Sequence, residues 1–69
     1  MSAILPRTAV VFDERVLWHL ASGTVVRELG VQGRTFVADD RTPGRLWNGI
    51  HQCPVHAIEM PVEVSRRET

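Results

Sequence analysis

Apolar residues occur along this chain only in short groups, and turn-forming residues separate each group from the next. No span repeats apolar residues at positions i, i+3, i+4 and i+7 for long enough to make a helix of about three turns. The segment Thr24-Val25-Val26-Arg27-Glu28-Leu29 is typical: it is rich in β-branched residues and ends at a glycine. The pattern therefore predicts an all-β chain.

We expect five short strands, separated by turns, after a first apolar group at 9–12. They cover residues 16–20, 24–29, 34–38, 46–53 and 58–64, and Gly49 marks a bulge or a close backbone approach within the fourth. Gly30 and Gly33 can supply the positive φ angles that a tight hairpin turn requires. Residues 54–57 have the length of a single 3₁₀ turn, placed just before the last strand.

The small size of the chain argues for closing these strands into a barrel. At 69 residues and 7.8 kDa it forms one domain at most, and such a domain buries only about 60% of the surface of its unfolded chain. A flat sheet would leave two unpaired edges, whereas a partly closed barrel pairs most of them. We expect a barrel at 9–64, between a flexible segment at 1–8 and a charged tail at 65–69. Its predicted interior consists of Val16, Trp18, Val25, Leu29, Phe36, Ala38, Leu46, Ile50, Val55 and Ile58.

The order of elements, with a 3₁₀ turn before the final strand, resembles small SH3-like and Tudor-like barrels over residues 14 to about 62. Thr42-Pro43-Gly44 and the segment 54–59 are also similar to plasmid-borne type II dihydrofolate reductases. Those proteins are SH3-like barrels that assemble as tetramers, and a strand before their Pro-Val lines a shared pore for folate and the nicotinamide cofactor. Here that strand reads Ile50-His51-Gln52-Cys53, which differs at three of the four positions. The resemblance implies a pore at 50–53.

Two weaker resemblances concern other parts of the chain. Residues 16–23, followed later by Phe36, resemble the first two strands of Sm-like RNA chaperones. Cys53-Pro54-Val55-His56-Ala57-Ile58 resembles the segment around the last cluster ligand of bacterial ferredoxins. Because an iron–sulfur cluster needs four thiolates and this chain has one cysteine, that resemblance implies a ferredoxin-like fold without a cluster.

Cys53 lies close in sequence to possible metal ligands. With His51, His56 and His19 it makes an N₃S set that zinc accepts. The spacing favours a different interpretation, in which Cys53 is a small buried apolar residue and the histidines are partly exposed. Nucleophilic catalysis by Cys53 lacks a carboxylate to orient a histidine base. We therefore predict no catalytic residue, no metal and no cofactor.

The charge balance limits the kinds of partner. Eight arginines balance eight acidic residues, so the chain lacks the positive excess of a dedicated DNA coater or a polybasic membrane binder. Arginines at 27, 34, 41 and 45 form either a stripe for phosphate contacts or a mixed-charge solvated face. The predicted partner-binding residues are Trp18, Arg34, Arg41, Arg45, Trp47 and His51, on the loop 39–47 and an aromatic face.

The favoured function is a small non-enzymatic binding or assembly module for a protein or nucleic-acid partner. The alternatives are an oligomeric enzyme resembling type II dihydrofolate reductase, with its pore at 50–53, and a cluster-free ferredoxin-like or metal-linked protein centred on Cys53. A small core and open strand edges predict a homo-oligomer. A single cysteine predicts the cytoplasm, and apolar stretches far shorter than about twenty residues predict no membrane segment.

Overall fold

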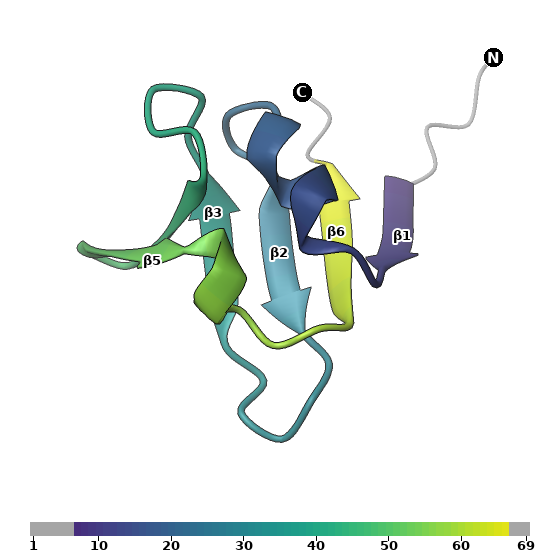
Figure 1. Cartoon of the computed structure of the whole chain (residues 1–69). Coiled ribbons are helices and arrows are strands. Elements are labelled where there is room, and N and C mark those ends of the chain that lie inside the picture. Colours follow the sequence, from purple (N-terminus) through teal and green to yellow (C-terminus); the bar gives the residue numbers. More distant parts are fainter. Residues whose placement is uncertain (1–6, 67–69) are drawn as a thin grey trace, which may run out of the picture.

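A computed structural model describes residues 7–66 and contains one six-stranded antiparallel sheet with two short 3₁₀ helices (Figure 1). In chain order the elements are β1 (Arg7–Val11), η1 (Glu14–His19), β2 (Val25–Glu28), β3 (Thr35–Ala38), β4 (Arg45–Asn48), β5 (His51–Pro54), η2 (Val55–Ala57) and β6 (Val62–Arg66). The strands lie in the order β1-β6-β2-β3-β4-β5. The all-β prediction is confirmed, but the sheet has six strands instead of five and does not close into a barrel.

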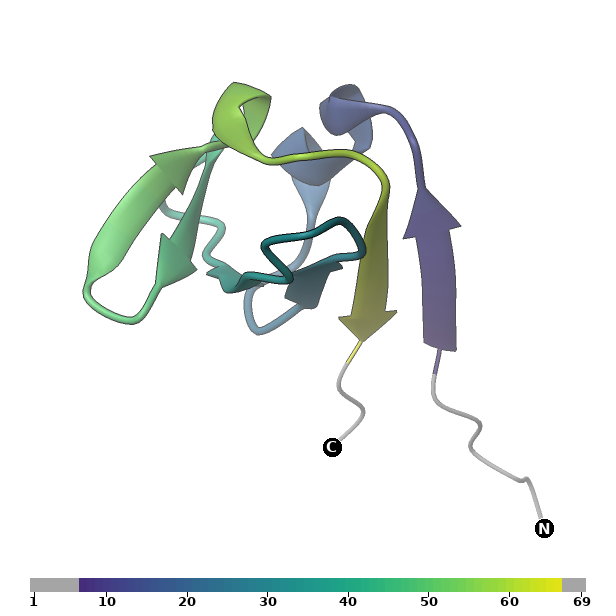
Figure 2. The same cartoon turned by 90° about the horizontal axis from the view of Figure 1, so that it is seen from below.

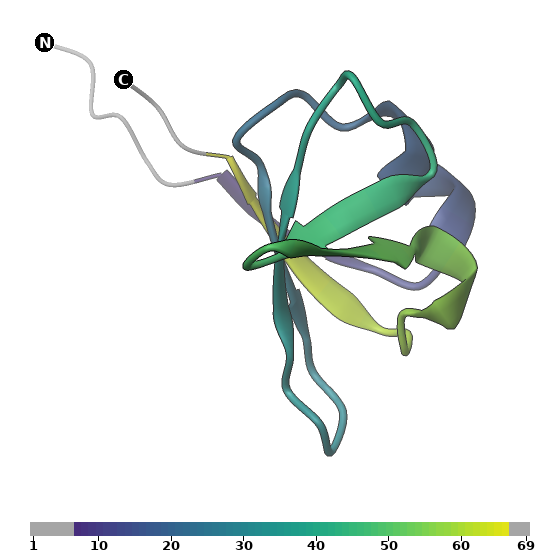
Figure 3. The same cartoon turned by 90° about the vertical axis from the view of Figure 1, so that its left-hand side faces the viewer.

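The sheet is strongly bent, and both 3₁₀ helices lie on the same side of it (Figure 2). Seen along the sheet, the β4–β5 hairpin runs across the direction of β2 and β3 (Figure 3). The core fills the space between the bent sheet and the two helices. Its buried members are Leu17, Val26, Phe36, Ala38, Leu46, Val55, Ile58, Val62 and Val64.

One turn prediction is confirmed in full and another in part. Residues 29–34 join β2 to β3, which pair antiparallel; Gly33 has the expected positive φ, at 60°, but Gly30 does not. The 3₁₀ turn expected at 54–57 is η2, which begins after Pro54 and directs Val55 into the core. Val55 also donates its N–H to the Gly44 carbonyl at 3.0 Å, and this bond fixes η2 against the start of β4.

The strand predicted at 16–20 is wrong, because this segment forms η1. The Asp13 carboxylate accepts the N–H of Arg15 at 3.0 Å and so caps the first turn. Leu17 is the only buried residue of η1, and Val16 and Trp18 on either side of it are both 48% exposed. A run of apolar residues that looks like a buried strand is therefore a helical turn anchored by one side chain.

The single strand predicted at 46–53 is two strands, β4 and β5. Asn48 pairs with His51 across a two-residue turn, in which Gly49 has a φ of +66° and Ile50 does not have a positive φ. Glycine at the first turn position matches a type II′ hairpin turn. Gly49 is therefore the turn residue of a hairpin, and not a bulge.

The first and last strands of the chain also differ from their predicted bounds. β1 begins at Arg7, two positions before the expected domain start, and residues 1–6 and 67–69 lie outside the described residues. The last strand was expected at 58–64 and is found at Val62–Arg66. Ile58 caps the end of η2 and is buried there, so the chain needs a connecting segment before β6 can begin.

The burial pattern shows where the predicted interior was right. Five predicted residues are buried: Phe36, Ala38, Leu46, Val55 and Ile58. Val25 is half-buried, and four others are exposed: Val16, Trp18, Leu29 and Ile50. The prediction lacked Leu17, Val26, Val62 and Val64, which are buried. No helix between residues 7 and 66 has the length and apolar character needed to cross a bilayer.

Candidate functional site

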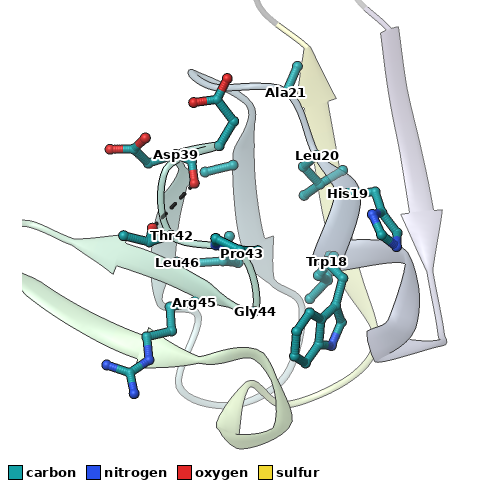
Figure 4. A pocket seen from close by; sticks show the side chains of 13 residues that line it. Trp18, His19, Leu20, Ala21, Asp39, Thr42, Pro43, Gly44, Arg45 and Leu46 are labelled. Carbon is teal, nitrogen blue, oxygen red and sulfur yellow. Dashed lines mark hydrogen bonds between the residues drawn. The ribbon is translucent and has the colours of Figure 1, made fainter.

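A cavity of about 330 Å³ opens between η1 and the segment that connects β3 to β4 (Figure 4). We call it the Trp18 pocket. One side is formed by residues 17–21, and the other by residues 38–40 and 42–46. Leu17, Ala38 and Leu46, all buried core residues, are among its lining residues. The pocket therefore borders the apolar core.

The Trp18 side chain forms one wall, and its position depends on Gly44. A Cβ atom at Gly44 would lie 2.7 Å from Cη2 and Cζ3 of the indole ring, which is closer than real Cβ contacts. Gly44 also has a φ of +81°, a conformation that other residues rarely adopt. The glycine thus allows the ring to lie against the backbone, while 48% of Trp18 remains exposed.

The opposite wall is a loop with its own hydrogen bonds. The Asp39 carbonyl accepts the Thr42 N–H at 3.0 Å, and its carboxylate accepts the N–H and the guanidinium of Arg41. These bonds from the Arg41 side chain and backbone lower the pKa of the Asp39 carboxyl. Asp40 donates its N–H to Ser22 Oγ at 2.8 Å. The loop 39–44 is therefore fixed both internally and to the turn before β2.

A second cavity, of about 670 Å³ and wide open, lies beside the same loop. Val37, Arg41, Trp47 and Gly49 are among its lining residues, and it shares Ala38, Asp39 and Asp40 with the Trp18 pocket. The Trp47 Nε1 is buried and has no hydrogen-bond acceptor within residues 7–66. One tryptophan therefore lines each of the two cavities that meet at residues 38–40.

The predicted partner-binding residues are divided between these places. Trp18 and Arg45 line the Trp18 pocket, and Arg41 and Trp47 line the second cavity. The Arg45 guanidinium donates to Gln52 Oε1 at 3.1 Å, and Figure 4 shows it directed away from Trp18. His51 lies on the exposed β5 strand and lines neither cavity.

Arg34 has a structural partner that the sequence analysis did not identify. The Glu28 side chain is fully buried and accepts hydrogen bonds from Nε and a terminal nitrogen of Arg34, both at 2.8 Å. Glu28 also accepts the backbone N–H of Arg34 at 3.2 Å and that of Glu59 at 2.9 Å. The Arg34 guanidinium lowers the pKa of the Glu28 carboxyl from 4.5 to about 2. The Glu28–Arg34 pair therefore ties the β2–β3 hairpin to η2 and to the chain after it, through the bonds from Arg34 to the Ala57 carbonyl and from the Glu59 N–H to Glu28.

The other arginines of the proposed stripe are also engaged. Arg27 pairs with Glu63 at 3.0 Å, and Arg41 pairs with Asp39 at 2.9 Å. Arg15, outside the stripe, pairs with Asp13 at 2.8 Å. Acidic partners thus accompany three of the four arginines of the stripe, in keeping with the mixed-charge interpretation.

The residues proposed as metal ligands do not come together. In the part of the chain that the structure describes, no group of three or more His, Cys, Asp or Glu side chains could hold a metal ion. Cys53 is a half-buried free thiol that packs against the core, and His19, His51 and His56 are exposed.

Two residues that shape the Trp18 pocket were not among the predicted site residues. Leu17 lines it and Gly44 accommodates the indole ring. In the sequence, the Pro43-Gly44 pair in a polar loop indicates an unusual backbone conformation at Gly44. It does not indicate that the Trp18 side chain packs against that glycine. No family model matches the chain, and comparisons with curated proteins and with solved structures give no match.

Proposed function

We propose that this protein is a small binding module that recognises a segment of a protein partner at the Trp18 pocket. The observation that carries the proposal is the half-exposed indole of Trp18, held against Gly44 at the edge of a cavity that buried core residues line in part. A fixed aromatic ring offers a large contact area at a low cost in conformational entropy. The proposal is in keeping with the resemblance to SH3-like and Tudor-like binding barrels, which rests on the 3₁₀ turn η2 before the last strand.

The lining of the pocket indicates the chemistry of the partner. Leu20 and Pro43 add to the apolar surface, while Asp39 and Asp40 place carboxylates at one side. An apolar side chain of the partner would contact this apolar lining and the Trp18 ring, and a neighbouring donor would meet Asp40. This combination suits a short apolar peptide segment flanked by a basic or amide group.

A protein partner is favoured over a nucleic acid because of the state of the arginines. Phosphate binding relies on arginines that are free to contact the backbone of the nucleic acid. Here three of the four arginines of the stripe, Arg27, Arg34 and Arg41, each lie in an ion pair with an acidic residue of the same chain, and Arg45 bonds to the neutral Gln52. Those ion pairs would have to be broken or shared before a phosphate could bind.

The proposal can be tested with peptides selected from a random displayed library against the whole protein. The affinity of a selected peptide is then measured by calorimetry for wild type, Trp18→Ala and Val16→Ala. Val16 is the matched control, because it lies on η1, is also 48% exposed and does not line the pocket. We expect Trp18→Ala to weaken binding by about 30-fold and Val16→Ala by less than about twofold.

Two results would contradict the proposal. Equal binding by Trp18→Ala and wild type would place the site elsewhere. Salt-dependent binding of a single- or double-stranded oligonucleotide, without any selectable peptide, would replace the protein partner by a nucleic acid.

A further inference from the structure

β1 is one edge of the sheet, and within the described residues no strand pairs with its outer side. Its inner side pairs with β6 over the full length, from Arg7 opposite Arg66 to Val11 opposite Val62. Thr8, Ala9 and Val10 are exposed. An unpaired edge of this kind offers backbone donors and acceptors to another strand.

The hydrogen-bond alternation of the sheet shows which groups point outward. In an antiparallel ladder, each residue directs its N–H and C=O to one neighbouring strand, and the next residue directs them to the other side. Leu29 donates to the carbonyl of Pro61 at 3.1 Å, so Pro61, Glu63 and Ser65 bond toward β2. Val62 and Val64 must then bond toward β1.

The same alternation continues across β1. Val11 lies opposite Val62 and Ala9 lies opposite Val64, so these two residues of β1 bond to β6. Thr8 and Val10 therefore direct their N–H and C=O groups away from the sheet. Within residues 7–66, the outward side of β1 thus has two donors and two acceptors without a partner strand, in the correct spacing for an antiparallel one.

The opposite edge, β5, is less suited to pairing. Asn48 and His51 close a two-residue hairpin turn and bond to each other, so Gln52 and Pro54 face outward. Proline has no N–H, which leaves Gln52 as the one outward donor of this strand. The proline blunts the β5 edge, and no proline interrupts β1.

Apolar side chains accompany the free β1 edge. Val10 is 50% exposed and Phe12, directly after the strand, is 75% exposed. Val10 pairs with Glu63 of β6, and Glu63 pairs with Arg27 of β2. Val10 therefore lies on the face of the sheet that is remote from the 3₁₀ helices. A strand added beside β1 would cover both apolar side chains together with the unpaired backbone groups.

We propose that β1 pairs antiparallel with β1 of a second copy of this chain, across a twofold axis at Val10. In this register the two Val10 residues exchange N–H···O=C bonds, and Thr8 of each chain meets Phe12 of its partner. The strand is its own complement because the same outward groups and the same apolar residues are presented by both copies. The two sheets become one continuous sheet of twelve strands, from six in each copy.

The first test is sedimentation equilibrium of the full chain from about 10 μM to 1 mM. We expect wild type to dimerise, and Val10→Pro to raise the dissociation constant by more than about tenfold because it removes the central donor. Val10→Lys keeps the N–H but places two charges at the axis, and should weaken the dimer likewise. Gln52→Pro is the matched control on the other edge and should leave dimerisation unchanged. The amide NMR spectrum of each variant serves as a control that the variant is folded.

The register is tested by oxidation in a Cys53→Ala background. A Val10→Cys variant should give a disulfide-linked dimer, since Cα atoms of a hydrogen-bonded pair are about 5.5 Å apart and within disulfide range. Cross-linking through Ala9→Cys alone would overturn the Val10 register. A monomeric wild type at about 1 mM, or a dimer that survives both Val10→Pro and Val10→Lys, would overturn the proposal. None of these outcomes depends on peptide binding at the Trp18 pocket.

Discussion

Glu28 has a structural role, as the buried partner of Arg34, that its position in the sequence does not indicate. It lies in a strand where buried and exposed positions alternate, and its side chain is on the buried side. The cost of burying a carboxylate is offset by hydrogen bonds from Arg34 and the Glu59 N–H. The sequence contains the pair six residues apart, but nothing in it distinguishes this pair from an exposed one.

We predict that Glu28→Gln lowers the free energy of unfolding by about 3 kcal/mol, because an amide loses the charge and directs a donor at other donors. Glu63→Gln is the control: its partner, Arg27, is more than half exposed, and the loss should be below about 1 kcal/mol. Urea titration of both variants measures the difference. Similar losses in the two variants would show that burial does not strengthen the Glu28–Arg34 pair.

The elements show where periodicity is informative and where it fails. Residues 24–29 and 34–38 were correctly predicted as strands, because the two pair with each other across a short connection and are bounded by glycine or a polar loop. The segment 16–20 was misassigned, since its apolar run gives no sign that only Leu17 is buried. Trp18 was predicted both as an interior residue and as a partner-binding residue, and the structure leaves it half-exposed; its contact with Gly44 arises between segments far apart in the chain.

Two turn glycines provide a matched test of that contact. Both have a positive φ, +81° at Gly44 and +66° at Gly49, but a Cβ at Gly49 meets no atom within 4 Å. We predict that Gly49→Ala costs about 1 kcal/mol from backbone strain alone, and that Gly44→Ala costs about 2 kcal/mol or more.

Urea unfolding measures both costs, and the indole N–H resonance of Trp18 reports the ring position. That resonance should shift in Gly44→Ala and remain in place in Gly49→Ala. An unshifted resonance in Gly44→Ala would mean that the ring does not need the glycine.

At the scale of the whole molecule, the sequence correctly predicted an all-β fold but wrongly predicted that its strands close into a barrel. Alternation and turn residues are local signals, whereas the pairing of β1 with β6 joins the two ends of the described chain. The expected barrel required its last free edges to meet, and instead β1 and β5 remain apart. Trp47, one of the predicted partner-binding residues, is only partly buried while its indole N–H is enclosed.

The acid stability of the molecule should depend on Glu28. Its pKa is lowered from 4.5 to about 2 in the folded state, so its contribution is complete above about pH 4.5 and is lost as the pH falls toward 2. We predict that the stability difference between wild type and Glu28→Gln is large at about pH 6 and shrinks through this range. Urea midpoints at four pH values measure it. A difference that stays constant down to about pH 2.5 would contradict the assignment to Glu28.

The pairing of β6 between β1 and β2 also bears on synthesis of the chain. β6 is the last described strand, and it brings Val62 and Val64 into the core. A nascent polypeptide therefore cannot complete its interior while β6 is still inside the ribosome, and until then the inner edges of β1 and β2 remain without their neighbour. The complete core can form only after β6 has emerged and paired with both strands.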